Sequence, residues 1–77
     1  MKFRHSEVVV LTKDIPMYGL KAGARGNVIE IYPGRGLEVE FERGEGKNPA
    51  LINIRERDVR KPDSFQVLTK RPLVETA

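Results

Sequence analysis

The stretch GLKAGARGNVIEIYPGRGLEVEFE, residues 19–42, decides the fold. Five glycines and one proline interrupt two short apolar runs, so the chain must turn, extend and turn again. In the last part, Leu37, Val39 and Phe41 alternate with three glutamates. This period of two is typical of a strand with one buried face and one wet face. We therefore predict a strand over residues 37–42.

The rest of the chain repeats this organisation with short apolar runs separated by turn signals, and helical periodicity is almost absent. Such spacing is typical of a small all-β domain. The predicted strands cover residues 7–11, 26–32, 37–42, 50–54 and 59–60. Between them we predict a long loop over residues 12–24, turns at 33–36 and 43–49, and a single tight turn at 55–58.

Five short strands with a long first loop predict a small five-stranded SH3-like barrel with a C-terminal extension. Closure of a barrel hides strand edges, and glycines at its corners let the backbone bend sharply. We divide the chain into an N-terminal leader at residues 1–6, the barrel at residues 7–61 and an extension at residues 62–77. The extension is predicted to hold an edge strand followed by a frayed tail.

The composition limits the chemistry that the chain can perform. Its 77 residues suit one small domain without cysteine, so neither disulfides nor thiolate metal sites are expected. A single histidine, His5, cannot anchor a zinc or iron site, and we predict no cofactor. The apolar run at residues 8–11 is too short for a signal peptide or a membrane span, so a cytoplasmic location is expected.

Catalytic and phosphate-binding patterns are missing as well. No nucleophile has a base beside it, and Glu38 and Glu40 share a strand face that is expected to be open to water, so we predict no enzymatic activity. The glycines of GLKAGARG lead into a strand rather than a helix, and no Gly-Lys-Ser or Gly-Lys-Thr follows them. A nucleotide-binding loop is therefore not indicated.

The charge is distributed unevenly along the chain. The formal net charge is +3, but residues 37–46 hold four glutamates against one arginine, a net charge of −3. Residues 55–71 hold six basic against three acidic side chains, a net charge of +3. The molecule is expected to present two surfaces of opposite charge.

The stretch VVVLTKDIPMYGLKAGARGNVIEIYPGRGLEVEFE, residues 8–42, resembles a family of small bacterial and archaeal proteins described as a domain of unknown function. The matching elements are the VVL strand, Asp-Ile-Pro, GLKAG and EVEF, and the resemblance extends over residues 8–60. It implies an SH3-like barrel with no assigned activity. Met17 and Tyr18 depart from the polar or acidic residues more usual in that family.

Gly26-Asn27-Val28 is similar, in addition, to the glycine-x-valine hallmark of KOW elements in ribosomal proteins and transcription factors. That similarity implies a loop whose basic residues meet RNA or protein. The candidates for nucleic-acid contact are Lys21, Arg25, Arg35, Arg55, Arg57, Arg60 and Lys61. Three glutamates on one strand face would repel phosphates, so RNA binding is the alternative rather than the leading hypothesis.

Protein recognition is the leading hypothesis. Met17 and Tyr18 lie on the long loop and belong to residue types favoured at interfaces, whereas Leu20 is expected to fold back over the barrel end. The acidic strand face suits a basic partner. The candidate protein-binding residues are Met17, Tyr18, Tyr32, Glu38 and Glu40. So few aromatic residues make a poor proline-rich-peptide groove.

We therefore predict a non-enzymatic accessory or inhibitor subunit that recognises another protein, with a protein encoded beside it as the first candidate. A second alternative is self-association through the segment from Phe65 to Leu68, an edge strand predicted to pair between chains. Phe3 and Phe65 are expected to brace the ends of the barrel.

Overall fold

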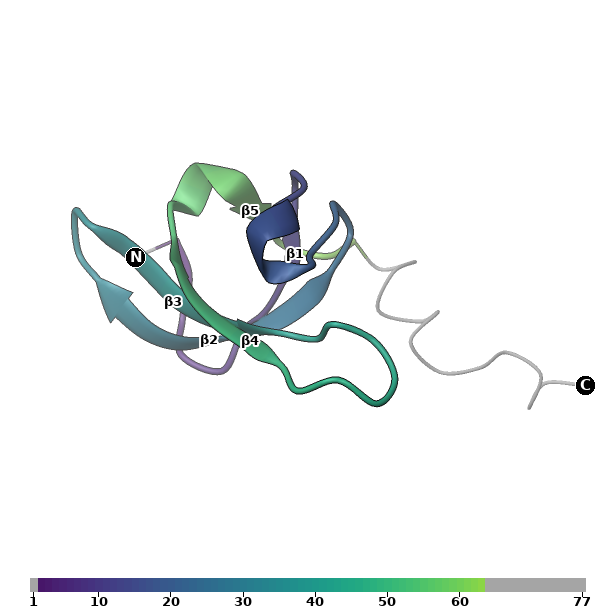
Figure 1. The fold of residues 1–77 in the computed structure, drawn as a ribbon. Coiled ribbons are helices and arrows are strands. Elements are labelled where there is room, and N and C mark those ends of the chain that lie inside the picture. Colours follow the sequence, from purple (N-terminus) through teal and green to yellow (C-terminus); the bar gives the residue numbers. More distant parts are fainter. Residues whose placement is uncertain (1, 64–77) are drawn as a thin grey trace, which may run out of the picture.

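The computed structural model describes residues 2–63, which form one antiparallel sheet curled into a half-barrel (Figure 1). Its strand order is β4-β3-β2-β1-β5. The strands are β1 (Val8–Leu11), β2 (Arg25–Tyr32), β3 (Gly36–Phe41), β4 (Ala50–Ile54) and β5 (Val59–Arg60). Two short 3₁₀ turns, η1 (Pro16–Tyr18) and η2 (Glu56–Asp58), lie in the long loop and before β5.

This architecture confirms the predicted all-β fold class and is consistent with a small SH3-like barrel. β4 and β5 have the predicted bounds, β1 and β2 differ from prediction by one residue at the N-terminal end, and β3 is shifted by one residue at both ends. Among residues 2–63 the sheet curls without closing, because β4 pairs only with β3 and β5 only with β1. The edge strand predicted between Phe65 and Leu68 lies outside the described residues.

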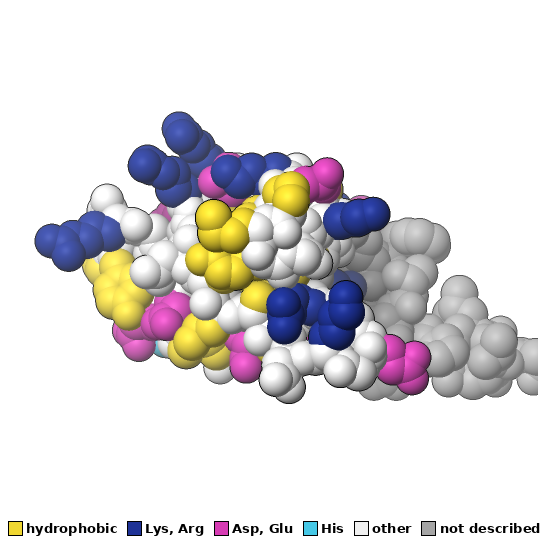
Figure 2. Space-filling view, in the orientation of Figure 1, with side chains coloured by type: hydrophobic (Ala, Val, Ile, Leu, Met, Phe, Trp, Pro, Cys, Tyr) yellow, Lys and Arg dark blue, Asp and Glu magenta, His cyan; other side chains and the backbone are white. Residues whose placement is uncertain are grey.

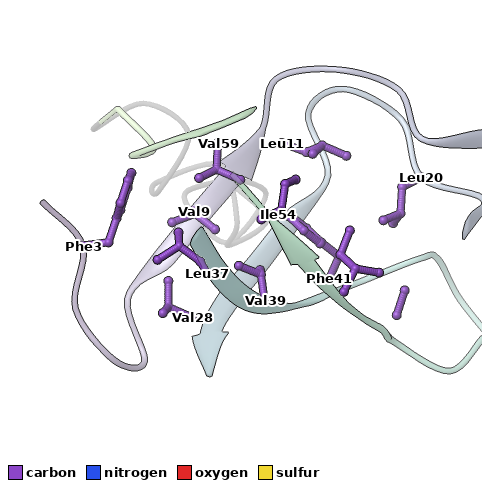
Figure 3. Packing of buried hydrophobic residues seen from close by; sticks show 12 residues of the cluster. Phe3, Val9, Leu11, Leu20, Val28, Leu37, Val39, Phe41, Ile54 and Val59 are labelled. Carbon is purple, nitrogen blue, oxygen red and sulfur yellow. The ribbon is translucent and has the colours of Figure 1, made fainter. Parts of the chain in front are cut away.

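Alternating side chains from every strand fill the concave side of the sheet (Figure 3). Val39 and Phe41 are fully buried, and their glutamate neighbours in β3 point away from the core. The cluster comprises Phe3, Val9, Leu11, Leu20, Val28, Leu37, Val39, Phe41, Ala50, Ile52, Ile54 and Val59. Phe3 is 1% exposed, so the first residues of the chain contribute directly to the core.

Two glycines are needed for this curvature. A Cβ at Gly26 would lie 2.7 Å from both Phe41 Cδ1 and Val39 Cγ1, so β2 crosses the core at a distance that only glycine permits. Gly36 has φ +114°, and a Cβ there would lie 2.6 Å from the carbonyl oxygen of Ile54. The sequence prediction that glycines allow close backbone approach is confirmed at these two positions.

A β-bulge interrupts the pairing of β2 with β3. The register shifts between Val28 and Glu30, so the inside–outside alternation is broken there. Ile29 follows the buried Val28 and faces outward, 43% exposed, and the bulge then lets Ile31 rather than Glu30 pack against the core.

Candidate functional site

An open groove of about 800 Å³ lies where the long loop faces the end of β4. Ile15 and Tyr18 line it from the loop, Arg35 lines it from the β2–β3 turn, and residues 52–58 supply the β4 and η2 side. These segments are distant in sequence, but the pairing of Leu37 with Ile54 brings the turn and η2 to the same end of the sheet. We call this hollow the groove.

The loop on one side of the groove is held by its own hydrogen bonds. Ile15 and Leu20 exchange backbone hydrogen bonds of 2.8 and 3.1 Å, and Asp14 Oδ1 accepts the N–H of Ala22 at 2.8 Å. Leu20 is 2% exposed, which confirms the prediction that it folds back over the core. This stem presents η1 to solvent, so Met17 is 82% exposed.

Tyr18 is 42% exposed and borders the groove directly. Its carbonyl oxygen accepts a hydrogen bond from Arg43 Nη1 at 3.4 Å, and Arg43 Nε also donates to the carbonyl of Asn48 at 2.7 Å. Arg43 therefore connects η1 to the β3–β4 loop. The position of η1 is therefore fixed by the Ile15–Leu20 hydrogen bonds below it and by Arg43 beside it.

The rim of the groove is basic. Lys13 Nζ lies 3.2 Å from Asp58 Oδ2 and is neutralised by that ion pair. The guanidinium groups of Arg35, Arg55 and Arg57, by contrast, make no ion pair or hydrogen bond within residues 2–63. Figure 2 shows Lys and Arg side chains gathered over η2, at the upper left of this face, and further out at its left end. The three arginines are available to an incoming anion.

The predicted protein-binding residues do not form one surface. Met17 and Tyr18 belong to η1, but Tyr32, Glu38 and Glu40 point outward from β2 and β3 on the convex face of the sheet. The hydroxyl of Tyr32 donates to Glu38 Oε1 at 3.1 Å. This hydrogen bond to a carboxylate raises the pKa of Tyr32, with partial desolvation adding to the effect.

The predicted nucleic-acid residues divide in the same way. Arg35, Arg55 and Arg57 line the groove, whereas Lys21 borders a separate shallow hollow beside Arg43. The remaining three candidates, Arg25, Arg60 and Lys61, do not line the groove.

Lys61 has a structural role near the start of the chain. Its Nζ lies 3.0 Å from Glu7 Oε2 and 5.7 Å from the centre of the Phe3 ring. Burial opposes ionisation of Glu7, but hydrogen bonds from Lys61 and from the Arg4 amide outweigh it and lower the Glu7 pKa. Lys61 thus fastens the end of β5 to the residues that precede β1.

Sequence reasoning missed Lys13 and Ile15 as lining residues. Their signal was present, because both precede Pro16 on the loop that was predicted to carry exposed contact residues. Among residues 2–63, no three Asp, Glu or His side chains converge in a way that would hold a metal ion. The same part of the chain has no helix of the length and apolarity needed to span a membrane.

Comparison with known proteins identifies a family. The profile of the family described as a domain of unknown function (DUF4926) matches residues 6–61, which include every strand and the whole groove. Neither the curated proteins nor the solved structures contain a match to this chain. The similarity to KOW elements stays a prediction. Because the matched segment spans well over half of the sequence, the chain belongs to the DUF4926 family, a domain of unknown function.

Proposed function

We propose that this chain is a non-enzymatic protein-recognition module that acts in the cytoplasm as an accessory or inhibitor subunit. The observation that carries the proposal is the groove, where three arginines without partners among the described residues stand beside the exposed η1 turn. The occupant is an acidic segment of another protein, with a protein encoded nearby as the first candidate.

The chemistry of the groove supports a protein ligand. Tyr18 offers a large flat side chain on a backbone that Arg43 helps to fix, and methionine, tyrosine and arginine are enriched at protein interfaces. An arginine fork can bind a carboxylate through two parallel hydrogen bonds, which gives direction as well as affinity. Ile15 and Ile52 provide apolar lining between these polar groups.

A photo-crosslinking experiment tests this proposal. A benzophenone amino acid replaces Tyr18 in the groove or, as the matched control, Ile29 on the convex face, since the two side chains are 42% and 43% exposed. In cells of the source organism we expect position 18 to give one dominant crosslinked protein. Position 29 should not crosslink to that protein. The adduct must disappear when Arg35, Arg55 and Arg57 are all replaced by glutamate. Equal adducts from both positions, or an adduct indifferent to charge reversal, would refute the proposal.

RNA binding is the second candidate, because the same three arginines would also attract phosphates. Tyr18 is the only aromatic residue within residues 2–63 that lines the groove, which disfavours the stacking of successive bases. Fluorescence anisotropy with labelled single-stranded RNA at low and at physiological salt distinguishes the candidates. Binding that weakens steeply with salt would favour RNA, and no binding at either salt would exclude it.

A further inference from the structure

The hydrogen-bond pattern of β3 shows which backbone groups of β4 point away from the sheet. The N–H of Glu42 donates to the carbonyl of Arg25 at 2.8 Å. In an antiparallel ladder every second residue bonds to the same neighbour, so this bond fixes the alternation along β3. Glu40, opposite Asn27, therefore directs its backbone toward β2, and Val39 directs its own toward β4.

The same alternation continues into β4. Val39 lies opposite Ile52, so the N–H and C=O of Ile52 belong to the ladder, whereas those of Leu51 and Asn53 point outward. β4 is the last strand of the sheet, and these outward groups find no backbone partner within residues 2–63. Alternate residues of a strand, such as Leu51 and Asn53, are about 7 Å apart. This is the repeat at which an added strand forms its backbone hydrogen bonds.

The two edges of the sheet are protected very differently. β5 has only two residues, one of them Arg60, and Lys61 and Pro62 follow it directly. Shortness, charge and proline are the usual means of preventing strand addition at an edge. β4 has five residues, Ala-Leu-Ile-Asn-Ile, without charge, proline or bulge in its pairing, so Pro49 and Arg55 flank this edge but do not interrupt it. Leu51 on this edge is 55% exposed.

The unprotected edge is continuous with the groove. Ile52, Asn53 and Ile54 all contribute to its lining, on the side opposite η1. Ile52 and Ile54 are 6% and 7% exposed, although they belong to the core cluster, whereas Val39 on the neighbouring strand is completely buried. The open side of the half-barrel therefore lies along β4 (Figure 1). Core side chains on this strand are more exposed to solvent than Val39 on the neighbouring strand.

We propose that an extended acidic segment of the partner protein adds to the sheet as a sixth strand along β4. Its backbone bonds to the outward groups of Leu51 and Asn53. Its acidic residues lie at the Ile54 end, where Arg35, Arg55 and Arg57 stand. The inference rests on the proposed function. It adds that the ligand in the groove is an extended strand and that acidic side chains of this strand face the arginines.

A second copy of this chain fits the edge less well. Antiparallel pairing of two β4 strands about Ile52 would place residues 47–49 of the second copy beside Arg55. That segment is Lys-Asn-Pro, so it brings a positive charge to the arginines and no carboxylate. In this register, charge complementarity favours an acidic segment from another protein over a second copy.

Peptide display provides the test. Random peptides long enough to cover β4 and its flanks are selected against the full chain, and the enriched sequences are synthesised. We expect alternating β-branched residues with Asp or Glu clustered at one end. N-methylation of the alternate amides that face Leu51 and Asn53 should weaken binding about tenfold, the loss expected for one or two hydrogen bonds. N-methylation of the intervening amides is the matched control and should leave affinity unchanged.

A variant of the protein provides the reciprocal measurement. Leu51→Pro removes an outward N–H without removing a bond to β3, and Leu51→Val keeps that N–H. We expect about tenfold weaker peptide binding for Leu51→Pro alone, with urea unfolding used to confirm that both variants fold. If the proline variant does not fold, the methylated peptides decide.

Enriched peptides without acids, affinity indifferent to methylation, or no enriched peptide at all would overturn strand addition. So would peptide-independent dimers that are seen by light scattering for the parent chain and are lost in Leu51→Pro, because they would show β4 pairing between copies. None of these results removes the crosslink expected from position 18. Loss of that crosslink with peptides still adding to β4 would instead overturn the proposed cellular role.

Discussion

Replacement of Gly36 by alanine tests the close approach that forms one end of the groove. The new Cβ would lie 2.6 Å from the backbone carbonyl oxygen of Ile54, and a backbone atom cannot rotate away as a side chain can. Separating the two strands should cost about 1–3 kcal/mol, as overpacking usually does. The φ of +114° adds about 1–2 kcal/mol for an L-residue. We expect a loss of about 2–5 kcal/mol, out of a total stability of about 4–12 kcal/mol for a domain of this length.

Gly34→Ala is the matched control, because it lies in the same turn with φ +78° but nothing within 4 Å of the added Cβ. It should lose only the conformational part, about 1–2 kcal/mol. Urea unfolding followed by far-UV circular dichroism measures both variants, and the slope of the transition shows whether their unfolding remains comparable. Equal losses at the two positions would refute the reasoning, because they would show that contact with Ile54 carries no cost.

Three further predictions concern the start of the chain and the convex face. Phe3→Ala should cost about 3–5 kcal/mol in urea unfolding because its ring is buried in the core. Since the folded-state pKa of Glu7 is lowered, its contribution to stability exists above the unfolded pKa and is lost as pH falls through the folded one. Lys61→Met should therefore lower the melting temperature at neutral pH, and its difference from the parent should shrink in acid. NMR titration should place the pKa of Tyr32 above that of an unperturbed tyrosine, and Glu38→Ala should return it toward the ordinary value of about 10.

Most of the fold could be predicted from the sequence because the buried apolar residues recur at every second position, which is the period of a strand. Leu37, Val39 and Phe41 occupy one face of β3 as their alternation predicts, and Pro49 marks the start of β4. The bulge after Val28 could not be predicted, since the apolar run around it lacks the alternation that would reveal a change of face. Local pattern alone contains no information on where one strand gains a residue over its neighbour.

The groove was harder to predict because it depends on long-range pairing. Arg35 and Arg55 are distant in sequence, yet a hairpin with Leu37 opposite Ile54 necessarily brings them together. The two strands were predicted, but the sequence analysis did not predict their register, which the structure supplies. The position of η1 was different, because it depends on the bond between Asp14 and Ala22 and on Arg43, which no periodicity indicates.

The uncharged edge strand β4 has a consequence for the concentration of this protein that a cell can tolerate. Copies without the proposed partner would expose Leu51 and its neighbours at a rising concentration, and only the charges that flank β4, at Lys47 and Arg55, would oppose their association. Balanced synthesis of the chain and the proposed partner, as from a shared transcript, would keep copies without a partner scarce. For purification, the same reasoning favours co-expression with the proposed partner over overproduction of the chain alone.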